Sequence, residues 1–209
     1  GKEHLTNPMK LSYFRAITDN DRNTAPLWDR TNIWQGENFD CVFNKVYSCK
    51  INGSRAEFTM SAAGVSRKPF FNYTLCYEFF ADGEVSVSLD GKIRENVVWL
   101  PRLGFEFKLP YDTSEFRYFG NGPMDSYCDM THHGITAWHE SDADREYVNY
   151  IRPQEHGNHY GCRALEIENS LKFSAEDTME ISVLHHSIEQ LTKAEHTDEL
   201  PTPDGTYVR

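Results

Sequence analysis

Apolar and polar side chains alternate with a period of two along most of the chain. In residues 71–79 the odd positions are large and apolar or aromatic, and the even positions are smaller or polar. This pattern is typical of a strand with one buried face. Turn signals at Asp82-Gly83 and Asp90-Gly91 enclose a second alternating run. Residues 70–90 therefore predict a hairpin that enters a meander.

The same alternation recurs elsewhere, in residues 39–51, 55–63, 103–109, 115–119, 163–173 and 178–186. Only one short helical pattern stands out, from Ile188 to His196. Because no helices of about 10–15 residues separate the expected strands, the pattern favours an antiparallel sandwich over a parallel α/β sheet. The fold class that we predict is all-β, and 209 residues suit one large domain of this kind.

The stretch from 110 to 129 joins an aromatic strand to a Gly-Asn-Gly-Pro segment. Gly120 and Gly122 tolerate backbone angles that other residues resist, and Pro123 fixes one angle and lacks an N–H donor. We therefore expect a sharp turn after Phe119. It would carry the acidic and aromatic residues that follow onto a connection across the sheet, where structural packing is their favoured role.

Charge and cysteine content exclude several classes of partner. The chain has 21 Lys and Arg against 32 Asp and Glu, a net charge of -11, which repels nucleic acids and anionic membrane surfaces. No run approaches the roughly 20 apolar residues of a membrane span, and the N-terminus has no apolar signal core. The five cysteines are odd in number and never spaced as C-x-x-C. We expect most of them to be reduced, and no zinc site.

Four blocks of sequence, in this order, resemble those of the large multidomain β-galactosidases of glycoside hydrolase family 2. They are FRAITDNDR at 14–22, WLPRLG at 99–104, YFGNGP at 118–123 and YIRPQEHGN at 150–158. Tyr127 and Asp129 also match residues that follow the third block in that family. From the residues alone, the charged first block is a self-capped turn held by aromatic packing, with direct ligand contact as the alternative.

The resemblance implies a position within a longer enzyme. The blocks belong to the C-terminal small-chain region, domain 5, whose fold is a β-supersandwich similar to that of galactose mutarotases. Residues 1–38 would form a lead-in and linker from the preceding domain, and residues 39–209 the sandwich. The chain resembles a piece that stops before the last strands of that domain.

The resemblance also implies an activity that this chain does not itself perform. Family 2 β-galactosidases hydrolyse terminal non-reducing β-D-galactosides with retention, using two glutamates of an upstream barrel. We therefore assign no catalytic residue and expect the isolated fragment to be inactive. It would contribute to the substrate entrance and to assembly. The expected partners are the galactoside through the parent enzyme, the upstream domains of the same chain and further copies in a homo-oligomer.

The loop that contains PQEHGN supplies the candidate site residues Glu155, His156 and Asn158. Pro153 restricts the residue before it to extended angles, which favours a loop that displays the Glu155 carboxylate. In the resembled enzymes this loop lies near the mouth of the active site. A surface salt bridge is the alternative role for Glu155. The chain has His156 where the family usually has Asn, so polar contacts do not transfer directly.

We expect no cofactor and no metal in this fragment, although the resembled enzymes often use Mg and Na at sites outside it. Adjacent histidines at 132–133 and 185–186 point to opposite faces of a strand, which disfavours a shared ion. The expected location is the cytoplasm, with the periplasm as the alternative.

Two other functions stay open. One is a free-standing mutarotase-like aldose epimerase with a His acid and a Glu base on a concave sheet. The sequence blocks of this chain, however, resemble those of the β-galactosidases, which argues against an epimerase. The other is a non-catalytic carbohydrate-binding module in which Trp138 or Tyr160 stacks on a pyranose ring, against core or interface packing as the plain alternative.

Overall fold

A computed structural model describes residues 3–21, 23–30 and 36–209. The described residues form strands β1 Lys10–Ser12, β2 Val42–Asn52, β3 Arg55–Gly64, β4 Phe71–Phe79, β5 Val85–Ile93, β6 Gly104–Leu109, β7 Glu115–Gly122, β8 Ile135–Asp142, β9 Asn158–Ile167, β10 Lys172–Leu184 and β11 Thr206–Val208. Helices α1 Ala25–Trp28 and α2 Ile188–Lys193 are short, and 3-10 turns lie at Asp19–Asp21 and Thr197–Glu199. All of the strand pairs are antiparallel. The all-β prediction is confirmed.

The chain divides into two compact units. One combines Gly1–Asp19 with Arg102–Arg209 and carries a seven-stranded sheet in the order β1-β6-β11-β10-β9-β7-β8. The other spans Asn20–Pro101 and carries a four-stranded sheet, β2-β3-β4-β5. These two units do not coincide with the expected division into residues 1–38 and 39–209. That division stays a prediction.

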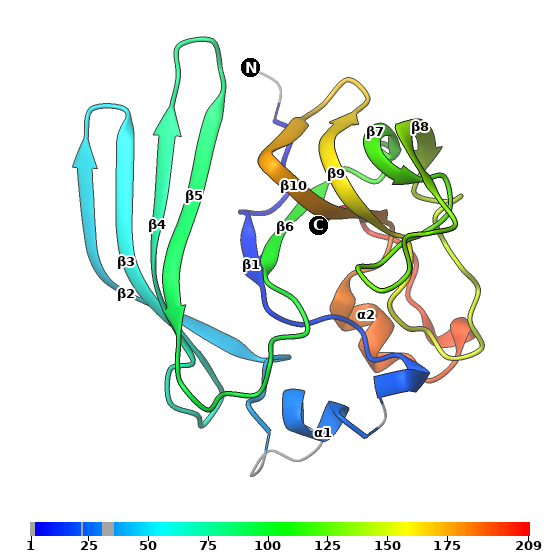
Figure 1. The fold of residues 1–209 in the computed structure, drawn as a ribbon, viewed down its shortest axis with the longest axis horizontal. Helices are drawn as coiled ribbons and strands as arrows, with labels where there is room; N and C mark the ends of the chain where they lie inside the picture. The colour runs from blue at the N-terminus through cyan, green and yellow to red at the C-terminus, as the bar shows by residue number, and fades with distance from the viewer. Residues whose placement is uncertain (1–2, 22, 31–35) are drawn as a thin grey trace. The chain divides into compact units, whose positions relative to one another are not determined.

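Strands β2, β3, β4 and β5 lie side by side in the sheet of the four-stranded unit (Figure 1). Their register gives the sheet one apolar and one polar face. Its register places Cys49, Phe58, Leu75 and Leu89 in one row across the strands. Lys50, Glu57, Cys76 and Ser88 form the next row, whose side chains point to the opposite face. The alternation along each strand thus sorts the side chains as the sequence predicts.

The expected turn at Asp90-Gly91 is wrong, because β5 continues through it to Ile93. Gly91 lies opposite Tyr73, and a Cβ atom on Gly91 would come within 2.6 Å of the Tyr73 Cβ atom. Glycine is needed here for close strand packing and not for a turn. The turn at Asp82-Gly83 is confirmed, with a φ of 93° at Gly83.

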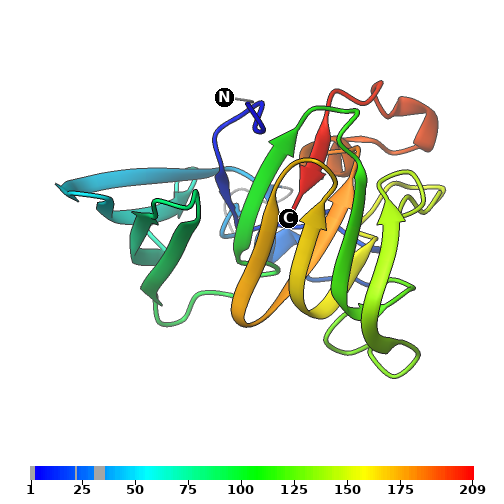
Figure 2. The same ribbon diagram turned by 90° about the horizontal axis from the view of Figure 1, so that it is seen from above.

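The seven-stranded unit buries one face of its sheet in an apolar core. Strands β10, β9, β7 and β8 lie side by side, drawn in orange, yellow and greens in Figure 2. The core includes Leu109, Phe116, Tyr118, Leu165, Ile181, Val183 and Val208.

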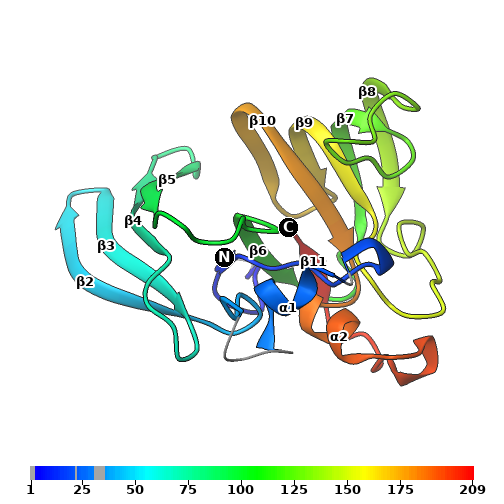
Figure 3. The same ribbon diagram turned by 60° about the horizontal axis from the view of Figure 1, so that its bottom comes forward.

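The opposite face of this sheet carries polar side chains at one end of the strands. The register aligns Glu106, Arg209, Ser182 and Asn158 in one row across four strands. Helix α2 lies beside the end of β10 (Figure 3), and Leu191 and Leu184 belong to one buried apolar cluster.

One expected strand and the expected helix differ from the observed elements. The segment 163–173 contains the end of β9, a turn with Asn169 at a φ of 52° and the start of β10, so it is not one strand. The expected helix at 188–196 is shorter and ends at Lys193. A capping box formed by Ser187 and Gln190 stabilises its N-terminal end. Strands β1, β8 and β11 lie outside the runs that alternation indicated.

The expected turn directly after Phe119 is also wrong, since β7 continues to Gly122. A Cβ atom at Gly120 would collide with the Sγ atom of Cys162. One at Gly122 would collide with the hydroxyl of Tyr118. Both glycines therefore allow other groups to approach the backbone, and the chain leaves the strand at Pro123.

Within the charged block, Asp19–Asp21 form a 3-10 turn, and the capping of this turn by its own side chains stays a prediction. Arg22, its last residue, lies outside the described residues. All five cysteines are free, and Cys76 and Cys162 are buried. Within the described part of the chain, no helix is long and apolar enough to cross a membrane.

Candidate functional site

Residues of all four sequence blocks, or directly after them, meet in the seven-stranded unit. The backbone N–H of Asp19 in the first block donates to the Oε1 atom of Gln154 in the fourth, at 3.0 Å. Arg102 of the second block forms an ion pair with Glu155 of the fourth. Segments that are far apart in the sequence are thus joined around the PQEHGN loop.

Tyr127, just after the third block, lies in the electrostatic field of this ion pair. Burial raises the pKa of its phenol, and the negative charges of Glu155 and Asp125 raise it further. The positive charges of Arg102 and Arg15 act in the opposite direction. We call Arg15, Arg102, Tyr127 and Glu155 the motif cluster.

The ion pair of the motif cluster is largely removed from water. The side chain of Glu155 is 3% exposed and that of Arg102 is 15% exposed. Glu155 lies on a loop as predicted, but its carboxylate is turned inward and pairs below the surface. The Nη1 atom of Arg102 is buried and has no hydrogen-bond partner among the described residues. The two N–H groups of Nη1 therefore have no acceptor among the described residues.

His156 is fixed in one tautomer by the backbone beside it. Its Nδ1 atom lies 2.7 Å from the carbonyl oxygen of Gln154, which can only accept, so Nδ1 carries the proton. In the neutral ring the buried Nε2 atom is then an acceptor, without a partner in the described part of the chain. Burial lowers the pKa of His156. The rings of His156 and Tyr147 pack edge to face, with their centroids 5.3 Å apart.

Asn158 is a structural link between three segments. It is 2% exposed, and its Nδ2 atom donates to the carbonyl oxygen of Ser126 and to the Oε2 atom of Glu180, both at 2.8 Å. Ser126 in turn receives contacts along β9, since its hydroxyl accepts from the N–H of Tyr160 at 3.0 Å. Asn158 therefore holds the segment after the third block against the sheet.

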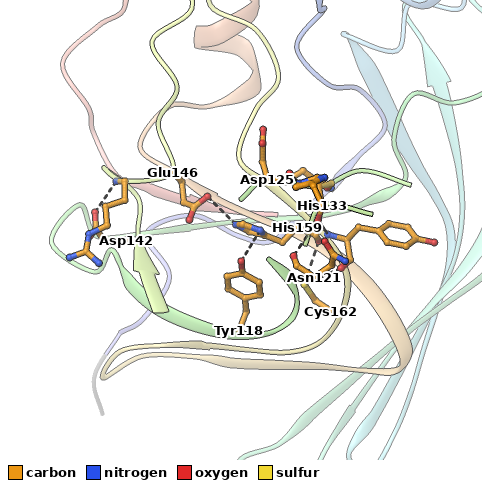
Figure 4. Close-up of polar contacts among 12 residues, drawn as sticks. Tyr118, Asn121, Asp125, His133, Asp142, Glu146, His159 and Cys162 are labelled. Atoms are coloured by element: carbon orange, nitrogen blue, oxygen red, sulfur yellow. Dashed lines mark hydrogen bonds and ion pairs between the residues drawn. The ribbon is translucent and has the colours of Figure 1, made fainter. Parts of the chain in front are cut away.

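A second polar group, Tyr118, His159 and Glu146, crosses the core of the unit (Figure 4). The Tyr118 hydroxyl lies 2.9 Å from Nδ1 of His159, and Nε2 of His159 lies 3.0 Å from the Oε2 atom of Glu146. Burial raises the pKa of Tyr118, so its hydroxyl keeps its proton and donates to the imidazole. The imidazole then donates to Glu146.

This relay has the order of an acid-base chain but no access for a substrate. Tyr118 and His159 are both 0% exposed. A buried polar chain with every partner satisfied is stabilising and specifies one arrangement of the core. We therefore assign it a structural role.

The structure brings the three predicted site residues together but buries all of them. Glu155 is 6% exposed, His156 1% and Asn158 2%. Just before them, Ile151 is 86% exposed and Tyr150 is 36% exposed. The inward residues therefore anchor a loop whose residues 148–152 are exposed.

Sequence reasoning assigned no site role to Arg102, Tyr127, Glu146 or Ser126, although it noted Tyr127 as a match after the third block. A signal existed for Arg102 and Tyr127, because the first lies inside a sequence block and the second directly follows one. Nothing in the local sequence marks Glu146 or Ser126, since their roles depend on strands that are distant in the chain. In residues 3–21, 23–30 and 36–209, no three His, Cys, Asp or Glu side chains group as a metal site would require.

Known proteins resemble this chain over its whole length. The family model described as "Beta galactosidase small chain" matches residues 1–209. A β-galactosidase of Actinobacillus pleuropneumoniae is 30% identical over 208 residues, which is 98% of this chain and 20% of that protein. A β-galactosidase of Streptococcus thermophilus is 27% identical over 100% of this chain and 21% of that protein.

The β-galactosidase BgaC of Bifidobacterium adolescentis is 28% identical over 100% of this chain and 20% of its own length. The chain thus spans about a fifth of the length of these relatives, and corresponds to a fragment of such an enzyme. With the family model matched from end to end, the chain belongs to the β-galactosidase small-chain family.

Proposed function

We propose that this chain is the small-chain part of a β-galactosidase that hydrolyses terminal non-reducing β-D-galactosides with retention, as in glycoside hydrolase family 2. The observation that carries this proposal is the family match over all 209 residues. Because the chain spans about a fifth of its relatives, the acid/base and the nucleophile are expected in another part of the polypeptide. The chain contributes to the substrate entrance and to assembly, and is not itself catalytic.

The motif cluster has a specific part in this proposal. Its buried ion pair and the fixed ring of His156 hold the loop that presents Tyr150 and Ile151 to solvent. Glu155, His156 and Asn158 are therefore positioning residues, which set the shape of the entrance through the loop. A rigid anchor of this kind keeps a loop in the geometry that binding requires.

The same proposal predicts the partners of the chain, its metal ions and its location. The upstream domains of the same polypeptide and further copies of it are the expected partners. Mg and Na, where the parent enzyme uses them, would bind outside these residues, and the cytoplasm is the expected location. A free-standing epimerase is not favoured, because His156 and His159 are 1% and 0% exposed and so cannot reach a sugar ring.

The test is a kinetic comparison in the whole polypeptide that carries this chain, with nitrophenyl β-galactoside as substrate. Glu155→Gln removes the charge that holds Arg102, and we expect KM to rise severalfold while kcat changes little, as loss of positioning predicts. Arg145→Gln is the matched control. It breaks the pair with Asp142, where the arginine side chain is 74% exposed, and both constants should stay unchanged.

Thermal unfolding of the same samples shows whether each variant is folded at the assay temperature. A folded Glu155→Gln enzyme with an unchanged KM would refute the positioning role. Absence of galactoside hydrolysis in the unmodified polypeptide would refute the proposed activity itself.

A further inference from the structure

One face of the seven-stranded sheet carries an exposed tryptophan beside a second aromatic ring. The register places Trp138, Phe119, Ala164 and Ser174 in one row across β8, β7, β9 and β10. The ring centroids of Trp138 and Phe119 are 5.7 Å apart, and Trp138 is 50% exposed. Ala164 and Ser174 have small side chains, so they do not rise above the sheet as far as the two rings do.

Charged side chains form the neighbouring row on the same face. The register aligns Glu140, Arg117, Glu166 and Lys172, so negative and positive charges alternate across the four strands. Arg117 lies 2.7 Å from Glu166, and Lys172 lies 3.3 Å from the other oxygen of the same carboxylate.

Arg117 also fixes the tryptophan. Its guanidinium carbon lies 4.9 Å from the centroid of the Trp138 ring, within the range of a cation–π contact. Because Glu166 holds Arg117 from the other side, the indole has a defined orientation although half of it is exposed. A fixed ring loses little conformational entropy when a ligand stacks on it.

These features match the two sides of a pyranose. The C–H face of a sugar ring is apolar and packs on an aromatic side chain, whereas its hydroxyl groups both donate and accept hydrogen bonds. The alternating row supplies donors from Arg117 and Lys172 and acceptors from Glu140 and Glu166. An equal number of both signs does not select a charged ligand.

We propose that Trp138, Phe119, Arg117 and Glu140, the Trp138 platform, form a binding surface for a neutral saccharide. The platform shares no residue with the motif cluster. It therefore goes beyond the proposed function, as a second sugar-binding site that performs no chemistry. An apolar protein partner fits less well, because covering the rings would also remove the adjacent charged row from water.

The test is affinity electrophoresis of the whole polypeptide in native gels that contain soluble β-galactan or dextran. We expect at least one polysaccharide to retard the unmodified protein. Trp138→Ala should weaken the apparent affinity about tenfold or more, because the stacking ring is lost. Trp138→Phe keeps an aromatic ring and should retain most of the retardation.

Ile135→Ala is the matched control, since Ile135 lies on the same strand and is 67% exposed but is outside the aromatic row. It should migrate like the unmodified protein, and all variants should keep the same kcat/KM for nitrophenyl β-galactoside. No retardation in either gel, or equal retardation of Trp138→Ala, would overturn the proposal. So would a change in oligomeric state in Trp138→Ala without any change in retardation, because that result assigns the surface to a protein contact.

The nitrophenyl assay separates this proposal from the proposed function. Retardation that depends on Trp138 in a polypeptide without hydrolytic activity would support the platform and refute the activity. Hydrolysis without retardation would do the reverse.

Discussion

At the scale of single residues, the two glycines of YFGNGP are required by the groups that lie against them. Gly122 faces the hydroxyl of Tyr118, and Gly120 faces the sulfur of Cys162. Because that hydroxyl begins the relay to His159, the glycine and the relay depend on one another. The sequence shows that glycine occurs here, but the reason is a contact with side chains.

Gly122→Ala should lower the free energy of unfolding by about 1–3 kcal/mol, because the added methyl group overpacks the site beside Tyr118. Urea unfolding monitored by circular dichroism measures the change. Gly104→Ala is the control, since nothing lies within 4 Å of its Cβ position. Equal effects of the two substitutions would contradict the proposed contact.

The buried ion pair of the motif cluster should matter more for stability than an exposed one. Glu155→Gln leaves Arg102 as a buried charge without its counter-ion and should cost about 3–5 kcal/mol. Arg145→Gln breaks an exposed pair and should cost less than about 1 kcal/mol. The midpoint of urea unfolding compares them, and a loss at Glu155 no larger than that at Arg145 would show that the pair is not held out of water.

Two histidines, the buried His156 and the partly buried His186, should make stability depend on pH. Burial lowers the pKa of His156 and of His186, and the charge of Arg209 lowers both further, whereas Glu155 and Asp125 act against it at His156. Below the unfolded-state pKa of about 6.5 the unfolded chain binds more protons than the folded chain. Stability should therefore fall as the pH falls below that value.

His156→Asn removes one of these groups and should make the free energy of unfolding less dependent on pH between neutral and mildly acidic conditions. Parallel urea titrations at several pH values measure the slope. A steeper slope in His156→Asn would contradict the direction assigned to its pKa.

At the scale of elements, alternation located strands well where each face of a strand is uniform. It predicted β4 from residues 71–79 almost to the residue, because its apolar face packs and its polar face does not. It did not find β8, in which both faces mix apolar and polar residues. The expected turn at Asp90-Gly91 was wrong because an Asp-Gly dipeptide fits two structures. It occurs in turns, and its glycine also fits a strand in which a neighbouring strand packs closely.

The four-stranded sheet leaves apolar side chains exposed on its edge strand β2 and at the end of the inner strand β4. Ile51 on β2 is 75% exposed, and Phe79 on β4 is 53% exposed. Both lie on the apolar face, and an open strand edge with exposed apolar side chains favours association between copies. We therefore predict that the 209-residue chain on its own associates at high concentration.

Sedimentation velocity over a range of concentrations measures this association. Ile51→Lys should reduce it, because a charge is then placed on the apolar face. Ser48→Lys, on the polar face of the same strand, should have no effect. A single monomeric species at every concentration would contradict the prediction.

At the scale of the whole molecule, the relation to longer enzymes determines where catalysis is expected. The relatives are about five times as long as the chain, since it spans about a fifth of each of them. We predict that residues 1–209 alone do not hydrolyse nitrophenyl β-galactoside, whereas the whole polypeptide does. Release of nitrophenol from both preparations at equal molar concentration tests this, and turnover by the isolated chain would contradict it.

The sequence by itself determined the all-β class, most of the strands and the family. Alternation depends on neighbouring residues, and each of the four blocks is a continuous run of residues. Both can therefore be recognised in the sequence alone. The tertiary structure alone decided what the blocks do with one another. Three arrangements join residues from segments that are distant in the chain: the pairing of Arg102 with Glu155, the relay from Tyr118 to Glu146, and the row that places Trp138 beside Phe119. Which segments meet depends on how the whole sheet pairs.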